Sequence, residues 1–228
     1  MNSKWRKRKF DGSGLTQYPP GPHLEKWNRQ RVLVTTPHFD DIGQILKLMN
    51  VEYEPFRGTF DCEILFINCG TSDRVDPAAL ADFVGAGGCV YASDHAGRVI
   101  DAAFPGAFRF AGRGGSVGHL PVDVVDPELR DILGARMTIE FDMGAWTQLG
   151  GCRGEVLLAH RKQPIMAYVE HGRGSVFYTS FHNKAQTSEH EKRLLQLLVL
   201  KQFSTKTHRT MAQAGHALGL RLDALRGG

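Results

Sequence analysis

Long apolar segments are missing from this sequence of 228 residues. No run of about 18 uninterrupted apolar residues occurs, so we expect no helix that spans a membrane. The first residues are basic, but no apolar stretch follows them, which argues against a secretory signal. We therefore expect neither a membrane-spanning helix nor a secretory signal.

Cysteine is sparse, and its spacing does not suggest a metal or disulfide framework. The four cysteines, Cys62, Cys69, Cys89 and Cys152, form no C-x-x-C pair. We therefore predict free thiols, no bound metal and no cofactor, and we expect the reducing environment of the cytoplasm. Cys69 and Cys89 are expected in or at the end of buried strands.

Positive charge is concentrated near the N-terminus. The formal net charge is +4, and the first ten positions contain Lys4, Arg6, Lys7, Arg8 and Lys9. Such a run attracts phosphate backbones or acidic protein surfaces, and a solvated arm is the alternative. Residues 1–30 also contain a Pro- and Gly-rich stretch and show no helix or strand period, so we interpret them as an extended arm.

Regular structure is expected from Arg31 onward. Apolar, β-branched runs alternate with helical patterns, which predicts an α/β fold: a flavodoxin-like, doubly wound and mainly parallel sheet. Asp76 followed by Pro77 is a strong signal for the start of a helix. The expected strands are 31–36, 51–56 (at an edge because of Pro55), 63–70 and 89–93, and the expected helices are 42–49, 76–84 and 96–103.

The pattern changes at residues 108–151, which we interpret as an insertion with antiparallel strands. A glycine-rich segment, Gly112 to Gly118, suggests a flexible lid or a partner surface. Two alternating strands with a short helix between them follow, and the sheet then resumes with an edge hairpin that turns at 172–174. The expected elements are strands 122–125, 137–142, 155–160, 164–169 and 175–180 and helices at 127–133 and from about 188.

The chain therefore divides into an arm (1–30), one domain (31–203) and a partly helical tail (204–228). The tail has a weak amphipathic pattern through Met211, Ala214, Leu218 and Leu222. Its last four residues, Leu-Arg-Gly-Gly, match the carboxyl end of ubiquitin, but no ubiquitin-like sheet precedes them.

One buried strand, 89–93, stops abruptly at Asp94-His95 and turns into a helix. Hydrolytic α/β enzymes place a nucleophile at such a strand-to-helix turn, beside the N-terminal amides of the helix. The residue at the tip of this turn is Asp94, and it is neither a cysteine nor a serine. The chemistry of the domain depends on that side chain.

Three motifs follow one another in a specific order. Residues 64–70 form a strand that ends in glycine, residues 87–97 contain the turn at Asp94, and residues 172–182 form a hairpin that ends in His182. Together they resemble the class I glutamine amidotransferase-like superfamily, and within it the ThuA-like (trehalose utilisation) branch. The resemblance covers about 31–203, and it implies an oxyanion hole near Gly70, a nucleophile elbow at Asp94 and a catalytic histidine at His182.

Two departures from the family pattern bear on activity. Asp94 stands where the family has its catalytic cysteine, and Asn183-Lys184 follows His182 where active amidotransferases have Pro-Glu. The carboxylate that orients the histidine is thus expected to be missing, and Asp94 cannot supply the thiolate that a thioester mechanism needs. We predict that glutamine amidotransferase activity is absent.

The carboxyl ends of the parallel strands should meet at one edge of the sheet, where ligands bind in open α/β folds. The side chains and amides expected at this edge are those of His38, Asp40, Asp41, Cys69, Gly70, Asp94, His95 and His182. In one hypothesis Asp94 and His182 form an acid–base pair, or a carboxylate nucleophile and its partner, and the amides of Gly70 and His95 stabilise an anion. A metal-dependent variant of this hypothesis has four ligands. They are His38, Asp94, His95 and His182.

Two interpretations without catalysis are also open. In the first, Asp94 caps the following helix, Cys69 only packs, and the chain is a degenerate domain that serves as a binding or scaffold subunit of a bacterial-type multiprotein system. In the second, the basic arm binds nucleic acid through a weak, salt-dependent attraction. The first interpretation implies a protein partner. Neither interpretation implies contact with a membrane, and the oligomeric state is open.

Overall fold

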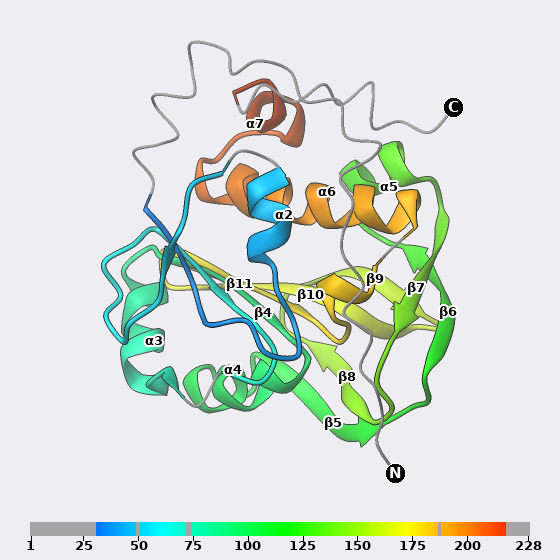
Figure 1. Ribbon diagram of the computed structural model, residues 1–228, viewed down its shortest axis with the longest axis horizontal. Helices are drawn as coiled ribbons and strands as arrows, with labels where there is room; N and C mark the ends of the chain where they lie inside the picture. The colour runs from blue at the N-terminus through cyan, green and yellow to red at the C-terminus, as the bar shows by residue number, and fades with distance from the viewer. Residues whose placement is uncertain (1–30, 49–50, 72–73, 187, 218–228) are drawn as a thin grey trace.

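The computed structural model describes residues 31–48, 51–71, 74–186 and 188–217, and a mixed sheet of nine strands forms its centre (Figure 1). The strand order is β2-β1-β3-β4-β11-β10-β9-β6-β7, and β5 and β8 form a second, two-stranded sheet. The strands are β1 Val32–Val34, β2 Glu54–Pro55, β3 Ile64–Ile67, β4 Cys89–Ser93, β5 Phe108–Gly114, β6 Gly118–Val124, β7 Arg136–Phe141, β8 Trp146–Cys152, β9 Glu155–His160, β10 Gln163–His171 and β11 Gly174–Thr179.

Five neighbouring strands, β2, β1, β3, β4 and β11, run parallel. Helices α2 (Gly43–Leu48) and α6 (Glu189–Lys206) cover one face of this half, and α3 (Pro77–Gly85) and α4 (Gly97–Ala103) cover the other (Figure 1). This order and layering confirm the predicted doubly wound, flavodoxin-like α/β fold. The expected edge position of β2 is confirmed as well.

Alternation along the strands divides the core into two layers, because successive side chains of a strand point to opposite faces. Val32, Val34 and Phe66 belong to the layer that also contains the buried leucines of α6. Leu33 and Leu65 belong to the layer under α3 and α4. Every residue of β1, β3 and β4 is buried, as strands covered on both faces require.

Local signals set the helix starts as expected. The side chain of Asp76 accepts the N–H of Ala79 at 2.8 Å, and Pro77 occupies the first turn of α3. Helix α6 begins next to the predicted position, and it passes through the expected boundary at residue 204. Its predicted apolar side is buried: Leu194, Leu195, Leu197, Leu198 and Leu200.

The insertion contains regular structure throughout most of its length. Strands β6 and β7 extend the main sheet beyond β9, with helix α5 (Pro127–Leu133) between them, as predicted. The interpretation of Gly112–Gly118 as a flexible segment is wrong at its start, because β5 pairs with β8 as far as Gly114. The register shifts between Phe110 and Arg113, where Gly112 has a φ of +85°, so the glycines accommodate an irregular strand.

The predicted hairpin of β10 and β11 is present, and Gly172 provides its turn with a φ of +59°. Its expected edge position is wrong, because β11 pairs with β4 and β10 pairs with β9, so the hairpin lies inside the sheet. Helix α7 (Met211–Ala217) follows α6, and Met211 and Ala214 are buried as expected. The basic arm, Leu218, Leu222 and the Leu-Arg-Gly-Gly end lie outside the described residues. Among the described helices, none combines the length and the apolar character that crossing a membrane requires.

Candidate active site

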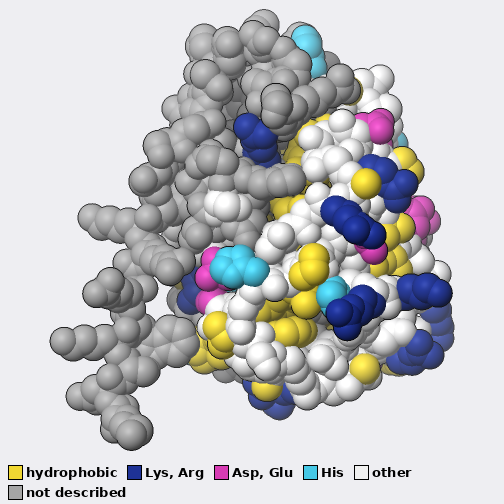
Figure 2. Space-filling view, turned by 90° about the vertical axis from the view of Figure 1, so that its right-hand side faces the viewer, with side chains coloured by type: hydrophobic (Ala, Val, Ile, Leu, Met, Phe, Trp, Pro, Cys, Tyr) yellow, Lys and Arg dark blue, Asp and Glu magenta, His cyan; other side chains and the backbone are white. Residues whose placement is uncertain are grey.

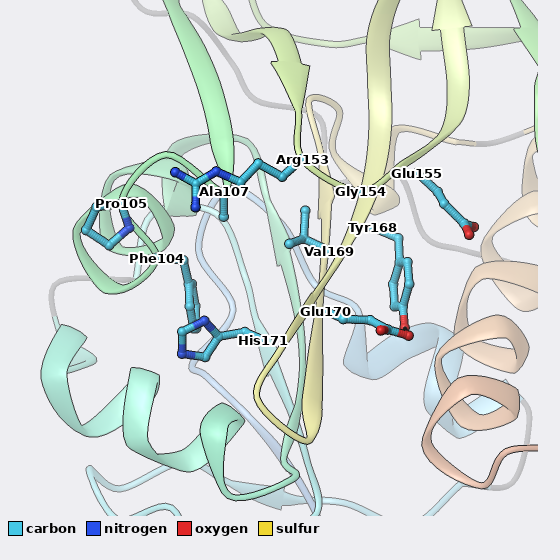
Figure 3. A pocket seen from close by; sticks show the side chains of 10 residues that line it. All are labelled: Phe104, Pro105, Ala107, Arg153, Gly154, Glu155, Tyr168, Val169, Glu170 and His171. Atoms are coloured by element: carbon cyan, nitrogen blue, oxygen red, sulfur yellow. Dashed lines mark hydrogen bonds between the residues drawn. The ribbon is translucent and has the colours of Figure 1, made fainter.

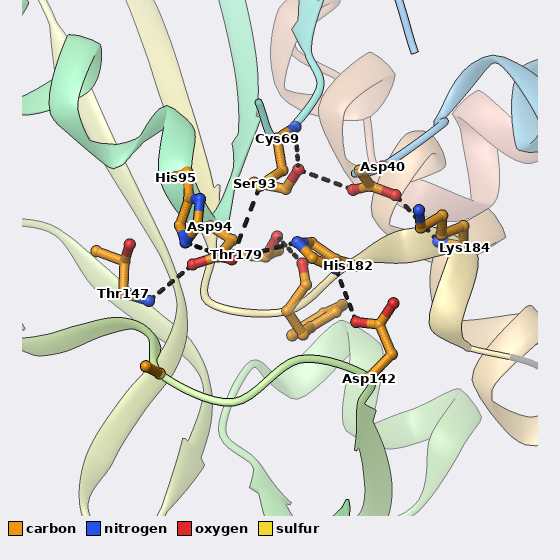
Figure 4. Close-up of polar contacts among 12 residues, drawn as sticks. Asp40, Cys69, Ser93, Asp94, His95, Asp142, Thr147, Thr179, His182 and Lys184 are labelled. Atoms are coloured by element: carbon orange, nitrogen blue, oxygen red, sulfur yellow. Dashed lines mark hydrogen bonds and ion pairs between the residues drawn. The ribbon is translucent and has the colours of Figure 1, made fainter. Parts of the chain in front are cut away.

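The ends of the parallel strands bring the candidate side chains together (Figure 4). Ser93 at the end of β4 pairs with Thr179 at the end of β11, so the two strands stop at the same level. Asp94 follows β4 directly, His182 comes three residues after Thr179, and the two side chains face each other, while Cys69 reaches them from beyond the end of β3. The predicted convergence at this edge is therefore present for these three side chains.

Asp94 forms a strained turn between β4 and the short 3-10 helix η2 (Asp94–Ala96). Its φ is +40°, in the left-handed region that aspartate tolerates better than most residues. The Tyr178 hydroxyl donates to the backbone oxygen of Asp94 at 2.7 Å, and the backbone N–H of Thr147 donates to Oδ1 at 2.7 Å. Neither η2 nor α4 has a side-chain capping bond, so the capping role considered for Asp94 is wrong.

His182 lies between two carboxylates. Its Nε2 is 3.2 Å from Oδ2 of Asp94, within ion-pair distance although not aligned as a hydrogen bond, and its Nδ1 is 2.7 Å from Oδ1 of Asp142. Asp142 follows β7 in the insertion. The expectation that no carboxylate orients the histidine is therefore wrong: a carboxylate does so, but it comes from a distant segment, which no local motif could have indicated.

The two carboxylates determine the charge of the histidine. Burial on its own lowers the pKa of His182, but the hydrogen bond to Asp142 and the carboxylate of Asp94 close to Nε2 outweigh burial and raise the pKa to about 12. Burial raises the pKa of Asp94, but His182 and the N–H of Thr147 outweigh it, and the pKa lies below its ordinary value. At neutral pH the site thus holds an imidazolium between two carboxylates.

Cys69 and His95 complete the surroundings of Asp94. The thiol of Cys69 is 3.7 Å from Oδ2 of Asp94, and burial raises its pKa although His182 lies close to it. Nε2 of His95 is 3.5 Å from the same oxygen and 2.7 Å from Nη2 of Arg113 in β5. Burial lowers the pKa of His95, and Arg113 contributes to that shift, so His95 is neutral at pH 7.

Gly70 and His38 lie next to each other beside the site. Gly70 has a φ of +92°, and a Cβ at this position would lie 2.7 Å from Nδ1 of His38. The N–H of Gly70 has no hydrogen-bond partner among the described residues. His38 is exposed and, within the described part of the chain, has no polar contact with Asp94 or His182, so the structure does not include it in the predicted site.

A second buried carboxylate, Asp40, ties the strand ends together beneath the site. It accepts hydrogen bonds from the Ser93 hydroxyl (2.8 Å), the Asn183 amide (2.6 Å) and the backbone N–H of Lys184 (3.0 Å). The Tyr91 hydroxyl in turn donates to Asn183 at 2.6 Å. The Asn-Lys pair that departs from the family pattern therefore serves to anchor the loop that carries His182.

A pocket of about 410 Å³ lies at the opposite edge of the sheet (Figure 3). Phe104, Arg153, Tyr168 and His171 are among the residues that line it. His171 pairs with Gly174, the first residue of β11, whereas His182 follows the last, so this pocket is remote from Asp94. On the face shown in Figure 2, several Lys and Arg side chains are exposed and Asp and Glu side chains are fewer.

The sequence matches no protein-family model and no curated protein. Solved structures do match. A ThuA-like protein from Bacteroides uniformis has a TM-score of 0.56 at 12% identity and aligns over 83% of this chain and 94% of its own. A cytoplasmic protein from Salmonella typhimurium has a TM-score of 0.55 at 11% identity and aligns over 75% of this chain and 98% of its own. A glutamine amidotransferase from Thermotoga maritima has a TM-score of 0.50 at 11% identity and aligns over 87% of this chain and 94% of its own. The chain therefore shares the fold of these structures, which include a ThuA-like protein and a glutamine amidotransferase.

Proposed function

We propose that the protein is a hydrolase in which Asp94 is a carboxylate nucleophile and His182 is its acid–base partner. The observation that carries the proposal is the line of Asp94, His182 and Asp142, in which one carboxylate stands at the strained turn and the other holds the far nitrogen of the imidazole. A nucleophile, a base within reach of it and a group that orients the base are the parts of a covalent hydrolytic site.

The cost of this arrangement supports a chemical role. Burying charges is expensive even when they are paired, and a left-handed φ adds about 1–3 kcal/mol of strain. Helix capping does not account for Asp94, because its carboxylate accepts from Thr147 in β8 and approaches His182. A site that only needed to pack could have used apolar side chains of similar volume.

With an ester substrate the first step uses the charges already present. An oxygen of the Asp94 carboxylate attacks the carbonyl carbon, the C–O bond to the alcohol breaks, and the alcohol leaves with the proton from Nε2 of His182. An acyl anhydride on Asp94 and a neutral His182 result. The N–H of Gly70, which has no partner among the described residues, is available to the oxyanion that forms in this step.

The second step restores both groups. Neutral His182 takes a proton from water as the hydroxide attacks the anhydride, the carboxylic acid leaves, and Asp94 is again ionised beside an imidazolium. Asp142 holds Nδ1–H throughout and keeps Nε2 directed at the reacting atoms. In this account Asp142 is a positioning residue and not a catalytic one.

A test needs a substrate with a good leaving group, such as a p-nitrophenyl ester. We expect turnover by the wild type, none by Asp94→Asn, and a single stoichiometric burst of p-nitrophenolate from His182→Gln, because that leaving group needs no acid while the anhydride still needs a base. Asp101→Asn, which removes an exposed carboxylate of α4, is the matched control and should behave as wild type. Unchanged turnover in Asp94→Asn contradicts the proposal.

A binding or scaffold subunit is the second candidate, and the burial of the pair favours it. Only 1% of Asp94 and 2% of His182 is exposed, so a substrate must enter past the partly exposed side chains of His95 and Asp142. In this case Asp94→Asn should leave capture of a protein partner intact, and deletion of residues 1–30 or 204–228 should weaken it. Binding of nucleic acid through the basic arm stays a prediction, which a gel shift with residues 1–10 deleted would test.

A further inference from the structure

Three side chains of types that ligate metals come together at Oδ2 of Asp94. The thiol of Cys69, the carboxylate of Asp94 and the imidazole of His95 place one donor atom each within 4.8 Å of the others. They come from the end of β3 and from two successive residues of η2, so packed elements fix their relative positions (Figure 4). Sulfur, carboxylate oxygen and imidazole nitrogen are donors that zinc accepts together.

The spacing fits one tetrahedral ion. Metal–ligand distances of about 2.0 Å for nitrogen and oxygen and about 2.3 Å for sulfur put neighbouring donors roughly 3.3–3.5 Å apart. The thiol of Cys69 lies 3.7 Å from Oδ2 of Asp94, and Nε2 of His95 lies 3.5 Å from it. These two contacts are within a few tenths of an ångström of tetrahedral spacing, and the third pair, Cys69 with His95, lies within 4.8 Å, so these two donors would have to move together to hold an ion.

A fourth donor points to the same place. Nε2 of His182 is fully buried, has no aligned hydrogen bond and lies 3.2 Å from Oδ2 of Asp94. Its Nδ1 is held by Asp142, which is how the second nitrogen of a zinc-binding histidine is usually held. Nε2 carries a proton in the imidazolium, so Zn²⁺ must displace that proton before this buried nitrogen can serve as the fourth ligand.

Arg113 shows that His95 already offers a lone pair to a cation. An arginine side chain can only donate, so Nε2 of His95, 2.7 Å from Nη2 of Arg113, accepts and carries no proton. Arg113 is exposed, and its Nε also donates to the backbone oxygen of Ala145 at 3.0 Å. It can swing away to let an ion reach His95.

We infer that Cys69, Asp94 and His95 form a binding site for Zn²⁺, with His182 as the fourth ligand. The inference does not depend on the proposed hydrolysis, because Cys69 and His95 have no part in the acyl transfer. The two are linked through Asp94: a carboxylate that ligates zinc cannot attack a carbonyl carbon. Zn²⁺ should therefore inhibit any turnover that depends on Asp94.

The test uses the full chain, freed of metal with a chelator and titrated with Co²⁺, a spectroscopic substitute for Zn²⁺. We expect one ion per chain and a cobalt–thiolate charge-transfer band, which Zn²⁺ abolishes by competition. Cys69→Ser should lose the band, and His95→Ala should bind at least about 100-fold more weakly, since even outer-shell losses cost 10–100-fold. Arg113→Ala should bind more tightly because it removes the competing cation.

Cys152→Ser is the matched control, because Cys152 is a half-buried free thiol in β8, and it should keep the band. Thermal unfolding of each variant without metal shows whether it is folded. The inference is overturned if neither the wild type nor Arg113→Ala shows a cobalt–thiolate band. It is also overturned if the band survives in Cys69→Ser. Because the readout is spectroscopic, this failure leaves the proposed hydrolysis untouched, and a failure of the esterase test leaves the metal site untouched.

Discussion

Replacement of Asp142 by asparagine tests the contact between Asp142 and His182, which the sequence could not predict. The change keeps the shape of the side chain but removes the charge that faces Nδ1 of His182 at 2.7 Å. Loss of a hydrogen bond to a charged group costs about 1.5–3 kcal/mol, and stranding a buried charge costs about 3–5 kcal/mol. The side chain of Asp142 is 24% exposed, and His182 keeps its contact with Asp94. We therefore expect the free energy of unfolding to fall by about 2–3 kcal/mol, near the lower end of these costs.

The assay is urea unfolding of the wild type and Asp142→Asn at pH 7. Asp123→Asn is the matched control, since Asp123 forms an ion pair of 3.0 Å with Arg136 on the surface, where a pair contributes about 0–1 kcal/mol. The reasoning is refuted if Asp142→Asn loses no more stability than Asp123→Asn.

The pH dependence gives a second check on this prediction. A pKa raised from 6.5 to about 12 means that the stabilisation by His182 is fully present below pH 6.5 and is lost as the pH rises toward 12. In Asp142→Asn the pKa of His182 should be lower than in the wild type. The stability of the variant therefore stops falling at a lower pH. The stability difference between the two proteins should therefore narrow between pH 7 and pH 10.

Three further substitutions probe the supports of the turn. Tyr178→Phe should cost about 1 kcal/mol in urea unfolding, because the backbone oxygen of Asp94 loses the hydroxyl but keeps the N–H of Gly97. Gly70→Ala should cost about 1–2 kcal/mol, since its φ of +92° is unfavourable for alanine, and a neutral effect would contradict that. Asn183→Ala should cost about 2–4 kcal/mol by leaving two buried groups short of a partner, and a loss below 1 kcal/mol would show that the Asp40 network is not structural.

The sequence predicts the parallel half of the sheet well, because short-range signals specify it. The strand around Leu65 is apolar throughout, the strand before Asp94 is apolar except for Ser93, and Asp76-Pro77 starts its helix as capping rules require. The glycine-rich start of the insertion is misread, because glycines that permit an irregular strand look the same in sequence as glycines of a flexible loop. Pairing with β8, a long-range contact, decides between them.

The site was predictable only in part, for the same reason. Asp94, His182 and Cys69 each follow the carboxyl end of a parallel strand, and the resemblance to a known fold implied that these ends meet at one edge. Asp142 reaches His182 from 40 residues away, through the path of the insertion, and no pattern around it signals this contact. The role of Asn183 is likewise visible only once Asp40 is known to lie beneath it.

His182 is an imidazolium held between Asp94 and Asp142. The most direct measurement is ¹⁵N NMR of histidine-labelled protein across pH 6 to 10, with His182→Gln to assign the signal. The account predicts that both ring nitrogens of His182 stay protonated through this range, and that Asp142→Asn brings its titration down into it. A His182 that titrates near pH 6.5 in the wild type would contradict the account.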